Sequence, residues 1–223
     1  MKLGRVIQIA LIAGAVLMLA ASASASTINY TTNAPNTIFA SGAGTITNAG
    51  LTLDSNGGTV SATLTFVPNS TSGVGVPSNI DLGDFLVVCA ACTTQAVGTG
   101  DATFGAFTFD LVVTDSTDVA TGEYVGSSGG GLVFSNESTI SISWLPLQLG
   151  PAGAGALTGN FGPTFFIITS PTGIVAPNSG TPQGDTTVQG FVSSTAVPEP
   201  ATMAMVGGLL IGLAALARKR RRT

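Results

Sequence analysis

Hydrophobic and polar residues alternate along much of the chain, as in β-strands with one buried and one exposed face. In "AFTFDLVVT" (106–114) one face holds Phe107, Phe109, Leu111 and Val113. The same alternation occurs at 59–67 and 138–144, and shorter candidate strands lie at 50–54, 122–126, 131–135, 164–170 and 186–194. The dominant period of two predicts antiparallel sheets.

Turn-forming residues separate these segments at short intervals. Clusters rich in Gly, Asn, Pro and Ser stand at 55–58, 68–73, 127–131 and 177–185, and 149–163 is predicted to be a long loop. Short strands separated by such turns predict an all-β fold, an antiparallel two-sheet β-sandwich. A jelly roll or a partly closed barrel is the alternative architecture.

The first 25 residues have the three parts of a secretory signal peptide. Lys2 and Arg5 precede the apolar run 6–20, and the small residues of "ASASAS" follow. We expect signal peptidase to cut after Ala25, with Ala23 as the alternative. The remainder of the chain is therefore expected to be exported.

A second apolar stretch, 201–217, carries no charge. At about 1.5 Å per helical residue it rises roughly 25 Å, slightly less than a hydrocarbon core of about 30 Å. Five basic residues follow it: Arg218, Lys219, Arg220, Arg221 and Arg222. We expect a transmembrane helix with a cytoplasmic stop-transfer signal behind it.

A proline-bounded strip precedes this predicted span: Val197, Pro198, Glu199 and Pro200. Proline disfavours helix for the residue before it, so the strip stays extended, as a protease or transpeptidase requires of its substrate. A Pro-Glu-Pro motif, a span and an Arg-rich tail, combined with a signal peptide, resemble the PEP-CTERM sorting signal. The resemblance covers only this C-terminal signal. It implies processing by an exosortase, a membrane-embedded enzyme of bacteria that make exopolysaccharide.

These features divide the chain into five segments. They are a signal peptide (1–25), an exported β-sandwich domain (26–192), a stalk with the Pro-Glu-Pro motif (193–200), a transmembrane helix (201–217) and a basic cytoplasmic tail (218–223).

The exported domain is acidic and has no cationic side chain. The chain contains no His, every Lys and Arg lies in a terminal segment, and all carboxylates except Glu199 lie between Asp54 and Asp185. Side-chain salt bridges are therefore excluded within the domain. Binding to nucleic acid is disfavoured, because no Lys or Arg can release counterions.

Cys89 and Cys92 are the two cysteines of the chain. A structural zinc site needs about four Cys or His ligands, so zinc is disfavoured. Export favours a disulfide, whose geometry requires a turn at Ala90 and Ala91. That turn would end the strand predicted by "DFLVVC" (84–89).

The exported domain lacks the side chains that usually act as a general base, so we expect no enzyme and no catalytic residues. A Ser, Thr or Cys nucleophile needs a neighbouring base, and the domain has neither His nor Lys. A glycosidase is the less expected alternative, because two carboxylates are sufficient for it. Its candidate acids are Asp81, Asp84, Asp101, Asp110, Glu123 and Glu137.

Calcium is the one cofactor that the acidic residues suggest. Asp115, Asp118 and Glu123 in "TDSTDVATGE" (114–123) offer the oxygen ligands that Ca²⁺ takes, and "NIDLGD" (79–84) is a second candidate. Nothing resembles an EF-hand loop. The competing interpretation is that both segments are acidic turns.

The leading functional hypothesis is a non-enzymatic protein of the cell envelope or extracellular matrix. An exosortase-like system would sort it after transient anchoring in the inner membrane, and it would associate with exopolysaccharide or biofilm. The alternative is a carbohydrate-binding or adhesive module, with or without a requirement for calcium.

Overall fold

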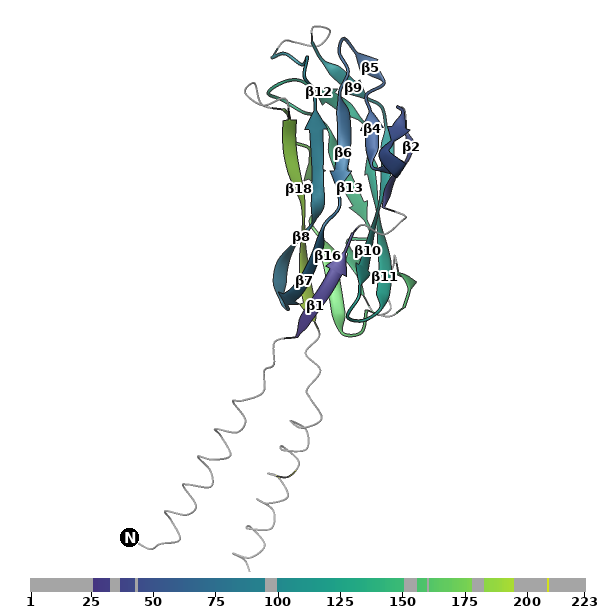
Figure 1. Ribbon diagram of the computed structural model, residues 1–223, viewed down its shortest axis with the longest axis vertical. Coiled ribbons are helices and arrows are strands. Elements are labelled where there is room, and N and C mark those ends of the chain that lie inside the picture. Colours follow the sequence, from purple (N-terminus) through teal and green to yellow (C-terminus); the bar gives the residue numbers. More distant parts are fainter. Residues whose placement is uncertain are drawn as a thin grey trace, which may run out of the picture. The chain divides into compact units, whose positions relative to one another are not determined.

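The structure is a computed structural model of the chain (Figure 1). It describes residues 26–32, 37–42, 44–94, 100–150, 156–159, 161–177, 183–194 and Gly208. Within these ranges no helix has the length and apolar character needed to cross a membrane. The signal peptide (1–25) and the transmembrane helix (201–217) predicted from the sequence lie outside the described residues.

Two large antiparallel sheets make up the described domain. The eight-stranded sheet has the order β17 (Thr172–Gly173), β13 (Ser141–Leu145), β11 (Ala120–Ser128), β10 (Phe107–Asp115), β1 (Thr27–Thr31) and β7 (Ser70–Gly75), with β15 (Ala156–Thr158) on β11 and β2 (Ile38–Gly42) on β10. The seven-stranded sheet has the order β14 (Gln148–Leu149), β16 (Thr164–Ile168), β18 (Gln183–Ser194), β8 (Ser78–Val88), β6 (Thr63–Val67), β4 (Thr52–Asp54) and β3 (Ile46–Thr47). A small third sheet joins β12 (Gly131–Val133), β9 (Ala102–Phe104) and β5 (Gly57–Gly58), and one 3₁₀ turn, η1, spans Asn48–Gly50.

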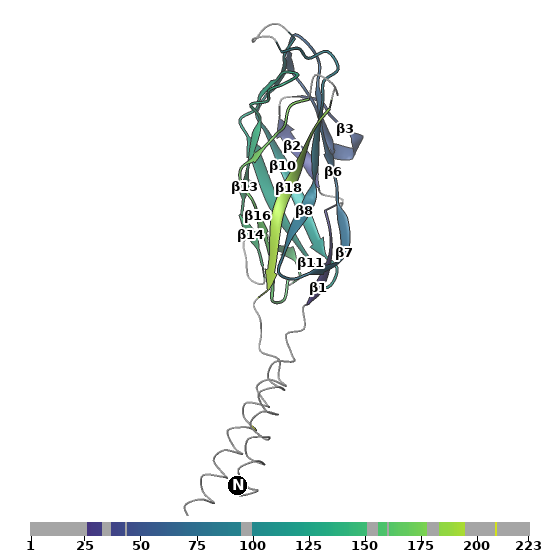
Figure 2. The same cartoon turned by 90° about the vertical axis from the view of Figure 1, so that its left-hand side faces the viewer.

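The predicted all-β sandwich is confirmed. Strand β10 buries the four residues that the alternation places together, and its partners β11 and β2 are both antiparallel to it. Figure 2 shows the long strands β8, β10 and β18 running lengthwise through the domain. The pleat turns every second side chain of each strand inward, and the core lies between the two sheets.

Several predicted segments differ from the structure, among them the predicted turn 55–58, where Gly57 and Gly58 form β5 and pair with β9. Residues 68–73, predicted to be a turn, contribute to β7, which is an edge strand with mostly exposed residues and therefore shows no hydrophobic alternation. The predicted loop 149–163 contains β15, which pairs with β11. Strand β18 continues to Ser194, so Ser193 and Ser194 of the predicted stalk pair with β16.

An aromatic cluster occupies the middle of the core. Phe109 of β10 is fully buried, and its ring centroid lies 4.7 Å from Phe39, 4.8 Å from Phe66, 5.1 Å from Phe85 and 6.3 Å from Trp144. Phe66 and Phe85 belong to the seven-stranded sheet, so this cluster joins the two layers. The buried Trp144 donates its Nε1–H to Thr172 Oγ1 at 2.9 Å.

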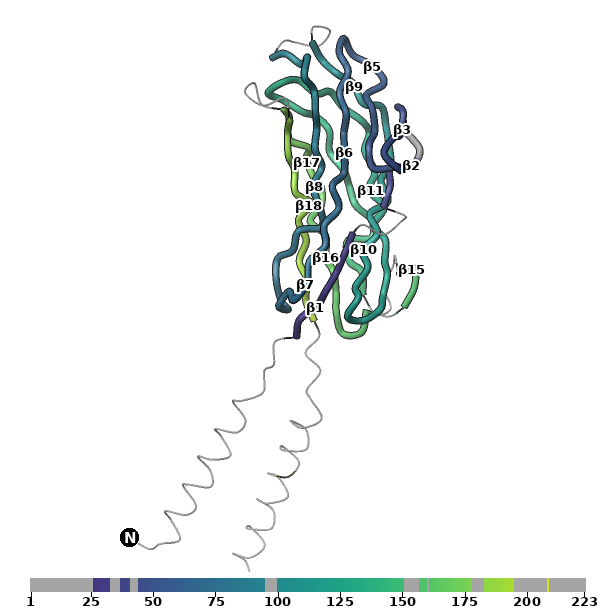
Figure 3. Tube along the Cα trace, viewed as in Figure 1, coloured from purple at the N-terminus to yellow at the C-terminus, as the bar shows by residue number. Residues whose placement is uncertain are grey.

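The described domain begins and ends on the same side. The tight connection between β7 and β8 marks that end, because Thr27 of β1 pairs with Gly75 and Val192 of β18 pairs with Ser78. Figure 3 shows β1 starting and β18 finishing there. The opposite end of β8 leads into the disulfide.

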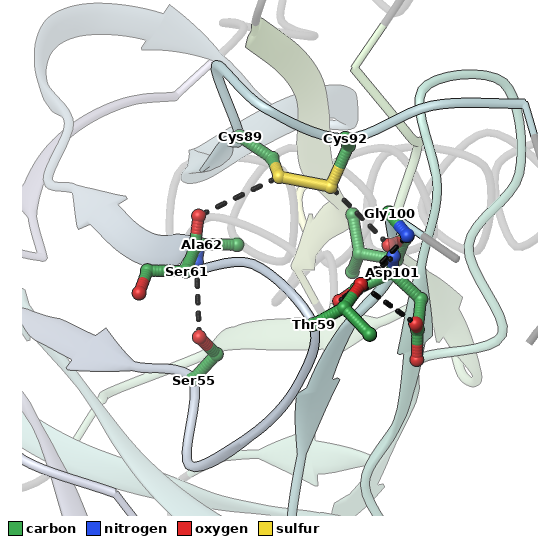
Figure 4. The surroundings of a disulfide bond; sticks show 9 residues. Ser55, Thr59, Ser61, Ala62, Cys89, Cys92, Gly100 and Asp101 are labelled. Carbon is green, nitrogen blue, oxygen red and sulfur yellow. Dashed lines mark hydrogen bonds between the residues drawn. A yellow bond between two sulfur atoms is a disulfide. The ribbon is translucent and has the colours of Figure 1, made fainter. Parts of the chain in front are cut away.

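Cys89 and Cys92 form a disulfide with their Cα atoms 5.4 Å apart (Figure 4). Strand β8 ends at Val88, and Ala90 and Ala91 form the turn between the two cysteines. The bond lies beside the segment 55–62 and near Asp101, whose carboxylate accepts a hydrogen bond from Thr59 at 3.2 Å.

Candidate binding groove on the seven-stranded sheet

Strands β8 and β18 carry a row of cross-strand pairs on the outer face of the seven-stranded sheet. The pairs are Asn79 with Phe191, Asp81 with Gln189, and Asp84 with Thr187. Asp185 continues the row on β18, where residues 183, 185, 187, 189 and 191 are all exposed. The alternation on β18 produces this row because Val188, Gly190 and Val192 are buried on the opposite face.

A β-bulge in β8 brings the two carboxylates of "NIDLGD" onto the same face. Residues three apart in a regular strand point to opposite faces, so Asp81 and Asp84 would be separated. The register with β18 shifts between Thr187 and Gln189, and both Leu82 and Gly83 are buried. The extra residue reverses the pleat, and both aspartates remain half-buried on the outer side.

The groove itself has a volume of about 410 Å³. Its lining residues are Asn79, Ile80, Asp81, Thr169, Thr187, Gln189, Gly190 and Phe191. Phe191 is 39% exposed and is the only aromatic residue among the exposed large hydrophobic residues of the described ranges. The groove therefore combines an exposed ring with amide, hydroxyl and carboxylate groups.

Hydrogen bonds fix the carboxylates of Asp81 and Asp84. The backbone N–H of Gly83 donates to Asp81 Oδ1 at 2.7 Å, and the Thr187 hydroxyl donates to Asp84 Oδ1 at 2.7 Å. Partial burial raises the pKa of Asp81, and the negative charges of Asp84 and Asp185 raise it further, whereas the Gly83 hydrogen bond lowers it. This side of the sheet therefore presents fixed acceptors and concentrated negative charge.

A second pocket, of about 350 Å³, lies along β1 and β7. Its lining residues are Asn29, Tyr30, Thr31, Ser70, Thr71, Ser72 and Ser116. It contains hydroxyl and amide groups without a carboxylate, and it offers less varied chemistry than the groove.

The structure does not bring the predicted calcium ligands together. Asp115 is fully buried, and its Oδ1 accepts the backbone N–H groups of Thr117 at 2.8 Å and Asp118 at 3.4 Å. Glu123 pairs with Val112, whereas Asp115 pairs with Ala120, so the two acids are roughly 10 Å apart along the strands. Across the described ranges, no three His, Cys, Asp or Glu residues form a group that could hold a metal ion. Calcium binding stays a prediction.

The candidate glycosidase acids are spread over the domain. Asp81 and Asp84 lie in the row described above. Asp110 and Glu123 occupy the outer face of the eight-stranded sheet, where burial first and then the charge of Asp110 raise the pKa of Glu123. Asp101 is buried near the disulfide, and Glu137 is exposed between β12 and β13.

We predict that acid stabilises the domain. Burial raises the pKa of Asp81, Asp110, Asp115 and Glu123 in the folded state. Raised carboxyl pKa values contribute stability that is fully present below the unfolded pKa, near pH 4, and is lost as the pH rises through the folded pKa. The thermal unfolding midpoint should therefore be higher at about pH 5 than at about pH 7.5, by about 2–4 °C for each kcal/mol gained.

Salt should raise the midpoint at neutral pH, because it screens repulsion among the carboxylates of a segment, 6–217, that contains no Lys, Arg or His. Calorimetric scans of the exported protein across pH and NaCl concentration measure both effects. A midpoint that falls on mild acidification would contradict the prediction.

The sorting and cleavage residues lie outside the described residues. They are Ala23, Ala25, Val197, Pro198, Glu199, Pro200, Arg218, Lys219, Arg220, Arg221 and Arg222. Sequence comparison covers those in the C-terminal segment. Residues 196–222 match the family model described as the PEP-CTERM protein-sorting motif.

That match confirms the resemblance seen in the C-terminal signal. The chain is an extracellular protein sorted by exosortase, and its route includes membrane-anchored passage and processing by that enzyme. Neither the curated proteins nor the solved structures contain a match to the chain.

Proposed function

We propose that the chain is a non-catalytic matrix protein that associates with exopolysaccharide after exosortase releases or re-anchors it near Val197–Pro200. The groove on the seven-stranded sheet is the observation that supports this proposal. It is an open site along two strands, with an exposed ring beside two amides and the carboxylate of Asp81. Ligand sites of this type combine an apolar surface with a few polar groups that fix orientation.

The charge distribution favours a carbohydrate over other polymers. From Val6 to Ala217 the chain has no Lys, Arg or His, so nucleic acids and polyanions meet only repulsion. Sugar hydroxyls, by contrast, can donate hydrogen bonds to the carboxylate of Asp81 and to the amides of the groove. An exported β-domain with this surface fits a role among polysaccharides.

Binding without cleavage is the function that the site chemistry supports best. Glycoside hydrolysis needs two carboxyl groups on opposite sides of the scissile bond. Asp81 and Asp84 instead lie in one row on one face of a sheet, and Asp84 already accepts a hydrogen bond from Thr187. A glycosidase is therefore the less favoured function.

We predict that the intact mass of the protein will end near Val197–Pro200 when it is purified from the medium and surface of its own host. The variant P198A/P200A should keep the mass of residues 201–223 and fractionate with the membrane, because it loses the extended strip. The basic tail of this variant is unchanged, so it separates recognition of the motif from anchoring.

Association is measured in the same preparation. The processed protein should co-sediment with the host exopolysaccharide, and enzymatic removal of the polysaccharide should release it. A wild-type protein that keeps residues 201–223 would contradict the processing, and a processed protein that never sediments with polysaccharide would contradict the matrix role.

A further inference from the structure

We infer that the groove binds a linear polysaccharide that carries free amino groups, with the sugar chain lying along β8 and β18. This inference rests on the proposed function and names the ligand class of the same site. Length, chemistry and charge of the groove and its adjoining row support it.

The row is long enough for several sugar units. Asp185, Thr187, Gln189 and Phe191 are successive outer residues of β18 and together extend about 20 Å at 3.2–3.4 Å per residue. Their partners on β8, in the same order, are Leu86, Asp84, Asp81 and Asn79. An extended polymer can therefore contact ring, amide and carboxylate groups one after another.

One end of the row provides an apolar surface between polar groups. Phe191 lies between Asn79 on β8 and Ile167 on β16, and over a third of its surface is exposed. An exposed ring of this kind can stack against the apolar face of a pyranose. Gln189 and Asn79 flank the ring and offer both donors and acceptors to the sugar hydroxyls.

The other end of the row is acidic, and the residues that the structure describes include no Lys, Arg or His to pair with it. Asp81, Asp84 and Asp185 lie close enough for the charges of the latter two to raise the pKa of Asp81. A protonated amino group between these carboxylates would replace repulsion with attraction. Uronic acids and sulfated sugars would add repulsion, so the charge selects for amino sugars with free amines.

Calorimetric titration of the processed protein with glucosamine hexamer, N-acetylglucosamine hexamer and a polyuronate tests the inference. We expect saturable binding of the glucosamine hexamer that weakens with added NaCl, binding of the acetylated hexamer weaker by about tenfold, and no binding of the polyuronate. Equal affinity for both hexamers would overturn the requirement for free amines.

Matched variants place the ligand. Asp81→Asn should weaken binding of the glucosamine hexamer about fivefold, whereas Asp110→Asn removes the same charge from the outer face of the eight-stranded sheet and should leave binding unchanged. Phe191→Ala should cost about tenfold, and Leu145→Ala, at a position that is 71% exposed on the eight-stranded sheet, should cost nothing. Equal losses from Asp81→Asn and Asp110→Asn would mean adsorption by net charge and would overturn the site.

The native polysaccharide separates this inference from the proposed function. If the protein co-sediments with host exopolysaccharide but does not bind the glucosamine hexamer, the ligand class is wrong and the matrix role stands. If it binds neither, both are refuted.

Discussion

Phe109→Ala is expected to destabilise the domain by about 3–5 kcal/mol, the cost of truncating a buried phenylalanine. The ring is fully buried and contacts aromatic side chains from both sheets. Its removal leaves a cavity at the point where the two layers meet, and the surrounding rings belong to separate strands that cannot collapse together. Since domains are typically stable by about 5–15 kcal/mol, the loss is a large share of the total.

Urea unfolding followed by the fluorescence of Trp144 measures this effect. Trp144 is the single tryptophan of the chain, and its ring lies 6.3 Å from Phe109, so its signal reports the same part of the core. Phe191→Ala is the matched control, because it removes the same atoms from the outer face and should cost below about 1 kcal/mol. Similar costs for the two variants would show that Phe109 does not join the layers.

The strand faces could be predicted because alternation depends on local sequence alone. Ile142 and Trp144 of the segment 138–144 are buried in β13, and Leu64 and Phe66 of 59–67 are buried in β6. The edge strand β7 was missed because both of its faces are largely exposed and polar. A strand held mainly by backbone hydrogen bonds leaves no hydrophobic signature.

The sorting signal could be predicted from the sequence, whereas the groove could not. Pro198, Glu199 and Pro200 are contiguous and can be recognised as a motif, whereas the groove depends on the pairing of strands about a hundred residues apart. The hydrogen bond between Thr187 and Asp84 spans 103 positions. Phe191 nevertheless left a signal, because it falls in the polar phase of 186–194. A large ring on the solvent face is a sequence-level indication of a binding surface.

Asp81 and Asp84 were singled out in the sequence, but their common face was hidden by the bulge. Regular alternation assigns them to opposite faces, and the extra residue at Leu82–Gly83 reverses the second half of β8. The carbonyl of Asp81 accepts hydrogen bonds from the Tyr30 hydroxyl at 2.6 Å and the Asn69 amide at 2.8 Å. These two donors come from other elements and hold the irregular backbone in place.

Gly83→Ala is expected to cost about 2–5 kcal/mol, because two penalties act at one position. Gly83 has a backbone φ of +118°, which residues with a side chain rarely adopt. A Cβ atom there would also collide with the ring of Phe66 and lie 2.7 Å from the carbonyl oxygen of Val67. Gly75→Ala is the control, since a Cβ on this edge-strand glycine meets nothing within 4 Å, and it should change the free energy of unfolding by less than about 0.5 kcal/mol.

The same substitution links the fold to the groove. If the bulge rearranges to accommodate the methyl group, Asp81 and Asp84 no longer share the outer face, and binding of the glucosamine hexamer should fall even in the fraction that remains folded. Thermal unfolding and calorimetric titration of Gly83→Ala and Gly75→Ala measure the two consequences separately. A folded Gly83→Ala protein with wild-type stability would show that the bulge does not need glycine. Wild-type binding despite the lost stability would instead show that the row forms without the bulge.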